Sequence, residues 1–266
     1  MMVLEIREVI QNGKGFVIGM VHCLPLPGTP GYGGSCDAII EHALRDAKTL
    51  EECGVDALIV ENMGDSPFAA RLDLIQSNAL AVVASKVRDA VRIPVGIDAA
   101  FNDYETSLSI AHIIGAEFVR IPVFVDTVEF YGGFITPCAR DCIRYRKAIG
   151  AENVMILADI QVKHTNMVLP HVSIESSARS AASCGADAII VTGSAIGQET
   201  PIEMIERVKK VVGVPVIAGS GVKESNIAEQ FKIADGAIIG SSLKDGGKLE
   251  NPISAELTRR LLAARV

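Results

Sequence analysis

Short aliphatic runs alternate with longer amphipathic stretches along the chain. The runs are rich in Val and Ile and apolar on both faces, as expected of parallel strands that helices cover. We predict eight strands, at Phe16–Val21, Ala57–Val60, Val95–Ile97, Phe118–Ile121, Val154–Ile160, Ala188–Val191, Val216–Ala218 and Ala237–Ile239. We predict helices at Asp37–Cys53, Leu74–Ala90, Asp103–Ile113, Ala139–Ile149, Ile174–Cys184, Pro201–Val211 and Glu224–Phe231.

Signals for helix ends accompany this alternation. Four glycines stand where helices should end, at Gly54, Gly115, Gly150 and Gly185. Glycine suits these positions because it readily adopts the left-handed conformation of a C-terminal cap. Thr200 precedes Pro201, which predicts an N-terminal cap with proline in the first turn.

Eight strand–helix units favour a closed parallel barrel. The second half of the chain also repeats a pattern of the first half. The segment Cys53–Val60 (CGVDALIV) is matched by Cys184–Val191 (CGADAIIV), and Ile93–Val95 resembles Val214–Val216. A twofold repeat is natural in a closed barrel and awkward in an open doubly wound sheet. We therefore predict fold class α/β, a single (β/α)8 TIM barrel over residues 1–266 with an N-terminal extension of about residues 1–14.

Composition narrows the class of protein. Of 266 residues, 49% are hydrophobic and 21% are charged, which is typical of a globular protein. The net charge of −7 argues against binding to nucleic acid, because phosphate backbones require a basic surface. We expect no signal peptide, because charged residues interrupt the first ten positions, and the sequence shows no apolar run of the roughly 20 residues that span a bilayer. Its six cysteines form no CxxC pair. We expect a cytoplasmic protein with reduced thiols and no membrane insertion, which assembles as a homo-oligomer.

Two glycine-containing segments predict a phosphate site. Gly219, Ser220 and Gly221 follow the seventh predicted strand, and Gly240 and Ser241 follow the eighth. Glycine lets the backbone approach an anion closely, and free N–H groups in such turns point at phosphate oxygens. Barrels of this type commonly hold phosphate at these two loops. The alternative is a pair of tight turns without a ligand. The spacing of dinucleotide-binding and Walker loops is absent.

Polar residues follow the other strands, where the active sites of such barrels lie. Candidates for catalysis are Asp159, Lys163, Glu61, Asp98 and His22, and candidates for substrate contacts are Asn62, Arg120, His164, Thr192 and Ser194. Asp159 is the strongest candidate for catalysis because it shares a strand face with Leu157. If the strand stays regular, the Lys163 side chain points to the same face as Asp159, and the His164 side chain points to the opposite face.

These residue types leave the chemistry open. A carboxylate at a strand end can act as a general base or hold a metal, and a shielded lysine can act as a base or a Schiff-base nucleophile. Glu61, Asp98 and Asp159 together would suit Mg²⁺, although no ligand spacing specifies a metal or any other cofactor. The structural alternative is that Glu61 and Asp98 pair with Arg120, while His22 shapes the proline-rich loop after the first strand.

Motifs spread over nearly the whole chain resemble the BtpA/SgcQ family. They are IGMVH at 18–22, LPLPG at 24–28, VEN-x-GD-x-PF at 60–68, ILADIQVKH at 156–164, IVTGSA-x-G at 190–197 and GSGV at 219–222. The resemblance implies a TIM barrel of the ribulose-phosphate-binding type. One branch of the family is associated with photosystem I biogenesis. Other branches are associated with sugars or with nucleotide hydrolysis. Gln161 stands where the family usually has histidine, which removes one potential proton carrier or metal ligand.

The leading hypothesis is an enzyme that acts on a small phosphorylated sugar or related phosphate ester. Isomerisation, epimerisation or aldol cleavage by proton transfer fits the polar residues best. One alternative is a non-catalytic assembly factor of the photosystem I type, since fold alone does not determine function. The other is a phosphate-ester hydrolase that requires Mg²⁺.

Overall fold

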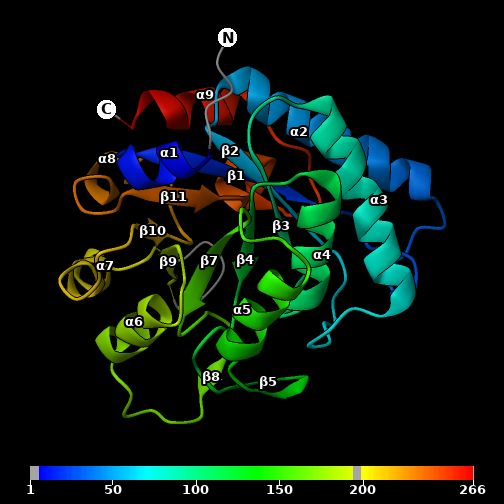
Figure 1. Cartoon of the computed structure of the whole chain (residues 1–266). Coiled ribbons are helices and arrows are strands. Elements are labelled where there is room, and N and C mark those ends of the chain that lie inside the picture. The colour runs from blue at the N-terminus through cyan, green and yellow to red at the C-terminus, as the bar shows by residue number, and fades with distance from the viewer. Residues whose placement is uncertain (1–5, 194–198, 266) are drawn as a thin grey trace.

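The computed structural model describes residues 6–193 and 199–265. Eight parallel strands close into a barrel with helices packed around it (Figure 1). The barrel strands are β1 (Phe16–His22), β2 (Ala57–Glu61), β3 (Val95–Asp98), β4 (Phe118–Ile121), β7 (Met155–Ile160), β9 (Ala188–Val191), β10 (Val216–Ala218) and β11 (Gly236–Ile239). They follow one another around the barrel in chain order, and β11 pairs with β1 to close it. The predicted (β/α)8 fold is confirmed, and every predicted strand end agrees to within one residue.

The helices outside the barrel also follow the predicted pattern. They are α1 (Ile6–Asn12), α2 (Cys36–Cys53), α3 (Leu74–Ala90), α4 (Tyr104–Ile114), α5 (Ala139–Ala148), α6 (Ile174–Ser183), α7 (Ile202–Lys209), α8 (Ile227–Gln230) and α9 (Ala255–Ala263). Among the residues described, none of these helices has the length and apolar character needed to cross a bilayer. Gly54 and Gly115 end α2 and α4 in the left-handed conformation, as predicted.

Two helices lie outside the sequence prediction. The segment expected to be an extension contains α1, whose Ile6 and Ile10 are buried with the interior side chains of the barrel. They share a face because they stand four residues apart in a helix. At the other end of the chain, α9 packs against α2. Helix α8 is shorter than predicted, because Asn226 bonds to Lys223 and Gly221 and forms a loop before it.

Thr200 does not cap α7. Pro201 occupies the N-cap position, and no side chain makes a capping hydrogen bond there. The Thr200 hydroxyl instead donates to the carbonyl oxygens of Val191, at 3.3 Å, and Ser220, at 3.1 Å. The prediction of a threonine cap was therefore wrong, because this hydroxyl connects the chain after β9 with the chain after β10.

The interior of the barrel changes from apolar to polar along its strands. Alternate residues of the strands, including Ile59, Met155 and Leu157, form one buried apolar cluster. On β7 the next residue of the same parity is Asp159, which is also buried. Polar side chains therefore lie above this apolar cluster, at the carboxyl ends of the strands.

A small antiparallel sheet stands over the same end of the barrel. It consists of β5 (Val128–Phe130), β6 (Gly133–Ile135) and β8 (Asn166–Met167), contributed by the segments after β4 and β7. Val123, Val128, Phe130, Ile135 and Val162 form its buried core. The sequence predicts only a loop here, because strands of two or three residues are too short for alternation to be recognised.

A buried ion pair joins α2 to the segment that follows β11. The Lys244 ammonium lies 3.1 Å from Asp46 Oδ2, and both side chains are fully buried. Lys244 also donates to the Asn251 carbonyl at 2.6 Å, and Asp46 accepts from the Ile253 amide at 3.0 Å. These bonds satisfy both charges and hold the chain after Ser241 in place.

We expect Asp46→Ala to lower the free energy of unfolding by roughly 3–5 kcal/mol, because it leaves the Lys244 charge buried without its partner. Urea denaturation measures this change. Glu256→Ala removes a carboxylate that is 81% exposed and should change stability by less than about 0.5 kcal/mol. Equal effects of the two substitutions would show that the buried pair does not stabilise the fold.

Candidate functional site

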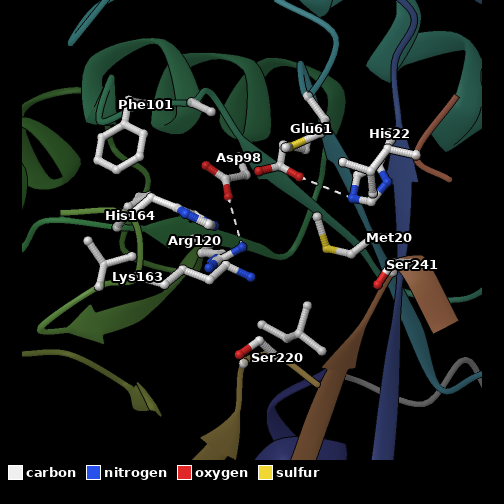
Figure 2. Close-up of a pocket in the computed structure, with 18 of the residues that line it drawn as sticks. Met20, His22, Glu61, Asp98, Phe101, Arg120, Lys163, His164, Ser220 and Ser241 are labelled. Carbon is white, nitrogen blue, oxygen red and sulfur yellow. Dashed lines mark ion pairs between the residues drawn. The ribbon is translucent and has the colours of Figure 1, made fainter. Parts of the chain in front are cut away.

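A cavity of about 410 Å³ lies at the carboxyl end of the barrel (Figure 2). The two glycine turns contribute Gly219, Ser220, Gly221, Gly240 and Ser241 to its lining. The other strand ends contribute His22, Glu61, Asp98, Arg120, Lys163 and His164. The cavity therefore brings together the predicted phosphate turns and most of the predicted polar residues.

The glycine turns expose backbone N–H groups. The amides of Gly221, Val222, Ser241 and Ser242 donate no hydrogen bond to any residue of the described ranges. The Ser242 hydroxyl donates to the Val222 carbonyl at 2.7 Å, which joins the two turns directly. Four main-chain donors from neighbouring strand ends are thus free to bind an anion.

Close packing requires glycine in both turns. A Cβ on Gly219 would lie 2.4 Å from Ile190 Cγ2, and a Cβ on Gly240 would lie 2.7 Å from Cε1 of His22. Gly221 has a φ of +68°, a conformation that side chains disfavour. The glycines thus bring the backbone against the strands and the His22 ring.

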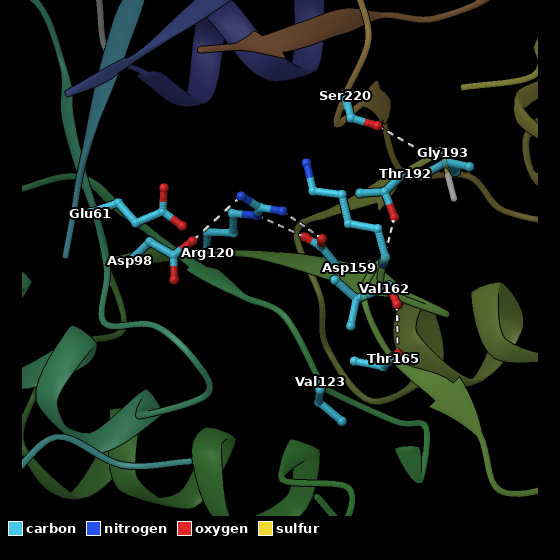
Figure 3. A network of polar contacts seen from close by, with 12 residues as sticks. Glu61, Asp98, Arg120, Val123, Asp159, Val162, Thr165, Thr192, Gly193 and Ser220 are labelled. Atoms are coloured by element: carbon cyan, nitrogen blue, oxygen red, sulfur yellow. Dashed lines mark hydrogen bonds and ion pairs between the residues drawn. The ribbon is translucent and has the colours of Figure 1, made fainter. Parts of the chain in front are cut away.

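Arg120 forms the centre of the polar network (Figure 3). Its Nε and Nη2 donate to Asp159 Oδ1 at 3.0 Å and Oδ2 at 2.8 Å. Its Nη1 lies 3.5 Å from Asp98 Oδ2. Burial lowers the pKa of Arg120, but the charge and hydrogen bonds of Asp159 outweigh that effect and raise it. The guanidinium therefore stays charged.

Asp159 points inward as the strand parity predicts, but it is not part of the cavity lining. Both of its oxygens bind Arg120, and the residue is 1% exposed. This geometry suits a residue that orients the guanidinium. It leaves no free oxygen to take a proton from a ligand.

The environment of Asp98 differs from that of Asp159, whose two oxygens are both bound by Arg120. It lines the cavity and is fully buried, and neither carboxyl oxygen has a hydrogen-bond partner in the described part of the chain. Burial raises its pKa well above the usual value, and the nearby charge of Glu61 adds to the rise while Arg120 opposes it. Asp98 therefore favours the protonated form, in which a carboxyl group donates a proton.

Glu61 is paired with His22. Nε2 of His22 lies 3.4 Å from Glu61 Oε2, and both residues line the cavity. Burial raises the pKa of Glu61, but the hydrogen bond and charge of His22, with help from Arg120 and Lys163, lower it overall. Two buried carboxyl groups on adjacent strands thus have pKa values shifted in opposite directions, that of Glu61 downward and that of Asp98 upward.

Lys163 and His164 both line the cavity, whereas strand parity predicted opposite directions. The strand ends at Ile160, and Gln161 and His164 adopt left-handed backbone conformations with φ of 46° and 64°. This turn breaks the alternation. The Lys163 amide donates to the Thr192 hydroxyl at 3.0 Å, which holds the turn against the chain after β9. Burial and the charge of Arg120 lower the pKa of Lys163, and burial lowers that of His164.

Two of the remaining candidates, Asn62 and Thr192, lie outside the cavity lining. Asn62 is buried and bonds to Asp65 and to the backbone of Ala100. Thr192 holds the turn that carries Lys163. Ser194 lies outside the described residues.

The proposed Mg²⁺ ligands do not form a metal site. Arg120 lies between Asp98 and Asp159, so a guanidinium stands where the cation would have to bind. In the two described ranges of the chain, no three His, Cys, Asp or Glu side chains are grouped to hold a metal ion. The residues present thus do not fit a cation held by Glu61, Asp98 and Asp159.

An aromatic wall is the feature of the cavity that the sequence did not predict. Phe68, Phe101, Phe130 and Tyr131 all line the cavity. The rings of Phe101 and Phe130 stack, with centroids 4.9 Å apart and an interplanar angle of 16°. Tyr131 also accepts the Phe68 amide, at 2.7 Å. The sequence at 131–134 is YGGF, and neither its glycines nor its aromatic residues indicate a stacked pair of rings.

Comparison with known proteins gives the family. The BtpA family model matches residues 14–265, and the chain belongs to this family. An uncharacterised protein of Pyrococcus furiosus is 41% identical over 92% of this chain and 93% of its own length. The photosystem I biogenesis protein BtpA of Synechocystis is 37% identical over 89% of this chain and 83% of its own. Thiamine phosphate pyrophosphorylase of P. furiosus has a similar fold, with a TM-score of 0.61 at 14% identity and 98% coverage of each chain.

The environment of Asp98 makes stability depend on pH. A carboxyl group whose pKa is raised on folding contributes stability below its unfolded pKa of about 3.9, and loses it as the pH rises through the folded value. We therefore expect Asp98→Asn to become progressively more stable than the wild type as the pH rises from 4 towards 8. Urea unfolding at several pH values measures the difference. Asp141→Asn, at an exposed position, should show no such trend. A constant difference across this range for Asp98→Asn would contradict the assigned environment.

Proposed function

We propose that this protein is an enzyme that acts on a small phosphorylated sugar or related phosphate ester. One observation carries the proposal: the two glycine turns and the buried ionisable side chains line the same cavity. A phosphate bound at the turns would position the rest of the molecule among Asp98, Lys163 and Glu61. Binding energy from this remote group would then contribute to orienting the reacting atoms.

The charge distribution supports a division of the cavity into two parts. The turns after β10 and β11 offer main-chain donors without a carboxylate in the same segments. Glu61, Asp98 and Arg120 lie at the carboxyl ends of β2, β3 and β4, on another part of the ring. Lys163 follows β7, between these groups in strand order. An anionic group thus favours the turns, away from the carboxylates.

Proton transfer is the chemistry that best suits the part of the cavity that contains Asp98 and Lys163. Asp98, whose pKa is raised, and Lys163, whose pKa is lowered, form a candidate acid–base pair. Isomerisation, epimerisation and aldol cleavage all require such a pair beside a carbonyl or hydroxyl group. Asp159 contributes by fixing Arg120, which would stabilise negative charge that develops on the substrate.

A non-catalytic role is the second candidate. It is favoured by one observation, the 37% identity to the Synechocystis protein named for photosystem I biogenesis. In that role the fold would serve as an assembly or stability factor, and phosphate esters would not be turned over.

Phosphate binding can be tested without knowledge of the substrate. We expect inorganic phosphate and glycerol phosphate to raise the melting temperature, because a ligand that binds only the folded state stabilises it. Ser241→Glu places a carboxylate beside the free amides and should weaken the apparent affinity at least about tenfold by charge repulsion. Ser225→Glu, at an exposed position outside the cavity lining, should bind phosphate like the wild type.

Identical melting shifts in both variants would contradict phosphate binding at the turns. A phosphate-release assay with glycerol phosphate, run with EDTA and with added Mg²⁺, distinguishes the hydrolase alternative. Release of phosphate that requires Mg²⁺ would favour that reaction over proton transfer.

For a substrate found by such screening, we expect Lys163→Met to lower kcat by about 10²–10⁴-fold, the range typical of a lost proton carrier. Phosphate-dependent stabilisation should persist, because the turns are unchanged. Steady-state kinetics and thermal shifts measured on the same preparation separate the two effects. Unchanged turnover in the variant would remove Lys163 from the mechanism.

A further inference from the structure

We propose that Lys163 forms a Schiff base with a carbonyl group of the substrate, which makes the substrate a phosphorylated aldehyde or ketone. This inference rests on the proposed phosphate site, and it goes beyond proton transfer by assigning a covalent step. It follows from three observations: the Lys163 amine has no side-chain partner among the described residues, the Asp98 carboxyl group has no hydrogen-bond partner there, and both line one cavity with the phosphate turns.

The amine of Lys163 is held in the cavity but is not bound by neighbouring side chains. Its backbone is fixed by the hydrogen bond to Thr192. Its Nζ forms no hydrogen bond or ion pair with any side chain in residues 6–193 or 199–265. The nearby carboxylates have other partners, because Asp159 binds Arg120 and Glu61 binds His22. A structural lysine would be expected to take one of these partners.

The surroundings of the amine favour its neutral, nucleophilic form. Burial and the positive charge of Arg120 lower the pKa of Lys163 (Figure 2). A lysine must lose its proton before its nitrogen can attack a carbonyl carbon. Much of the lining is apolar, with Phe101, Phe130 and Val162 among its residues. An apolar lining limits the water that would hydrolyse an imine.

Asp98 supplies the proton that imine formation needs. The Nζ lone pair forms a C–N bond while the carbonyl π electrons move to oxygen, which takes up a proton. The nitrogen loses a proton, the hydroxyl group is protonated and leaves as water, and the nitrogen lone pair forms the C=N bond of an iminium ion. Loss of the second N–H proton, which returns to the carboxylate that donated one, gives the neutral imine. Overall, one amine and one carbonyl give one imine and one water, with no oxidant or reductant. Asp98, buried without a hydrogen-bond partner among the described residues, can donate the proton to the departing hydroxyl.

The connections between loops place the amine near the phosphate turns. The Lys163 amide bonds to Thr192, and the next residue, Gly193, donates its amide to the Ser220 hydroxyl at 2.8 Å (Figure 3). Two short bonds therefore link the loops after β7, β9 and β10. A compact molecule with phosphate at Gly221 and Ser241 can present a carbonyl group to the lysine within the same cavity.

Pyridoxal 5′-phosphate and the smaller dihydroxyacetone phosphate are suitable probes, because each carries a carbonyl and a phosphate. The protein is incubated with each probe, reduced with borohydride and analysed by intact mass and peptide mapping. We expect one reduced adduct per chain, on Lys163, which competing inorganic phosphate suppresses. Lys163→Met should lose at least about nine-tenths of this adduct, and Asp98→Asn should form it about tenfold more slowly. Lys223→Met, at an exposed lysine outside this cavity, is the matched control.

The pH dependence of labelling distinguishes Lys163 from a lysine that is merely accessible to the probes. Labelling of Lys163 should reach half its maximum at a lower pH than labelling of exposed lysines. If phosphate and the probes stabilise the protein but Lys163 stays unmodified by both, the Schiff base is wrong and the phosphate site remains. If nothing stabilises the protein and adducts form only on exposed lysines, the proposed function fails as well.

Discussion

The bidentate pair of Arg120 and Asp159 determines the character of the whole carboxyl end of the barrel. Below it, the interior is closed by aliphatic and aromatic side chains. Above it, Asp98 and Lys163 line the cavity. Because Asp159 takes two of the guanidinium nitrogens, only the third approaches Asp98, at 3.5 Å. Burial and the charge of Arg120 thus lower the pKa of Lys163, whereas Arg120 only partly opposes the rise that burial causes in the pKa of Asp98.

The fold could be predicted closely from the sequence, because each barrel strand is an uninterrupted aliphatic run between helices. The convergence of the glycine turns follows from this fold, since consecutive strands of a parallel barrel end at the same face. The alternation of side chains along the strand also predicted correctly that Asp159 points into the barrel. It could not indicate which cation Asp159 would bind, because Arg120 is distant in sequence and its reach depends on the pairing of β4 with β7.

The remaining differences arise where local geometry departs from a regular element. The left-handed residues at Gln161 and His164 end the alternation and turn two consecutive side chains toward one cavity. The sheet of β5, β6 and β8 joins segments far apart in the chain, so no single stretch reveals it. Helix α1 is a short element that packs on the base of the barrel through Ile6 and Ile10, with Val9 partly buried beside them.

The buried pair of Asp46 and Lys244 has a consequence for ligand affinity. It fixes the backbone three residues after Ser241 to the longest helix of the barrel. The pair therefore restrains the segment that carries the Ser241 and Ser242 amides before any ligand arrives. Their conformational entropy is lost when the chain folds, not when the complex forms, and a rigid receptor of this kind binds a small anion more tightly than a loop that must first become ordered.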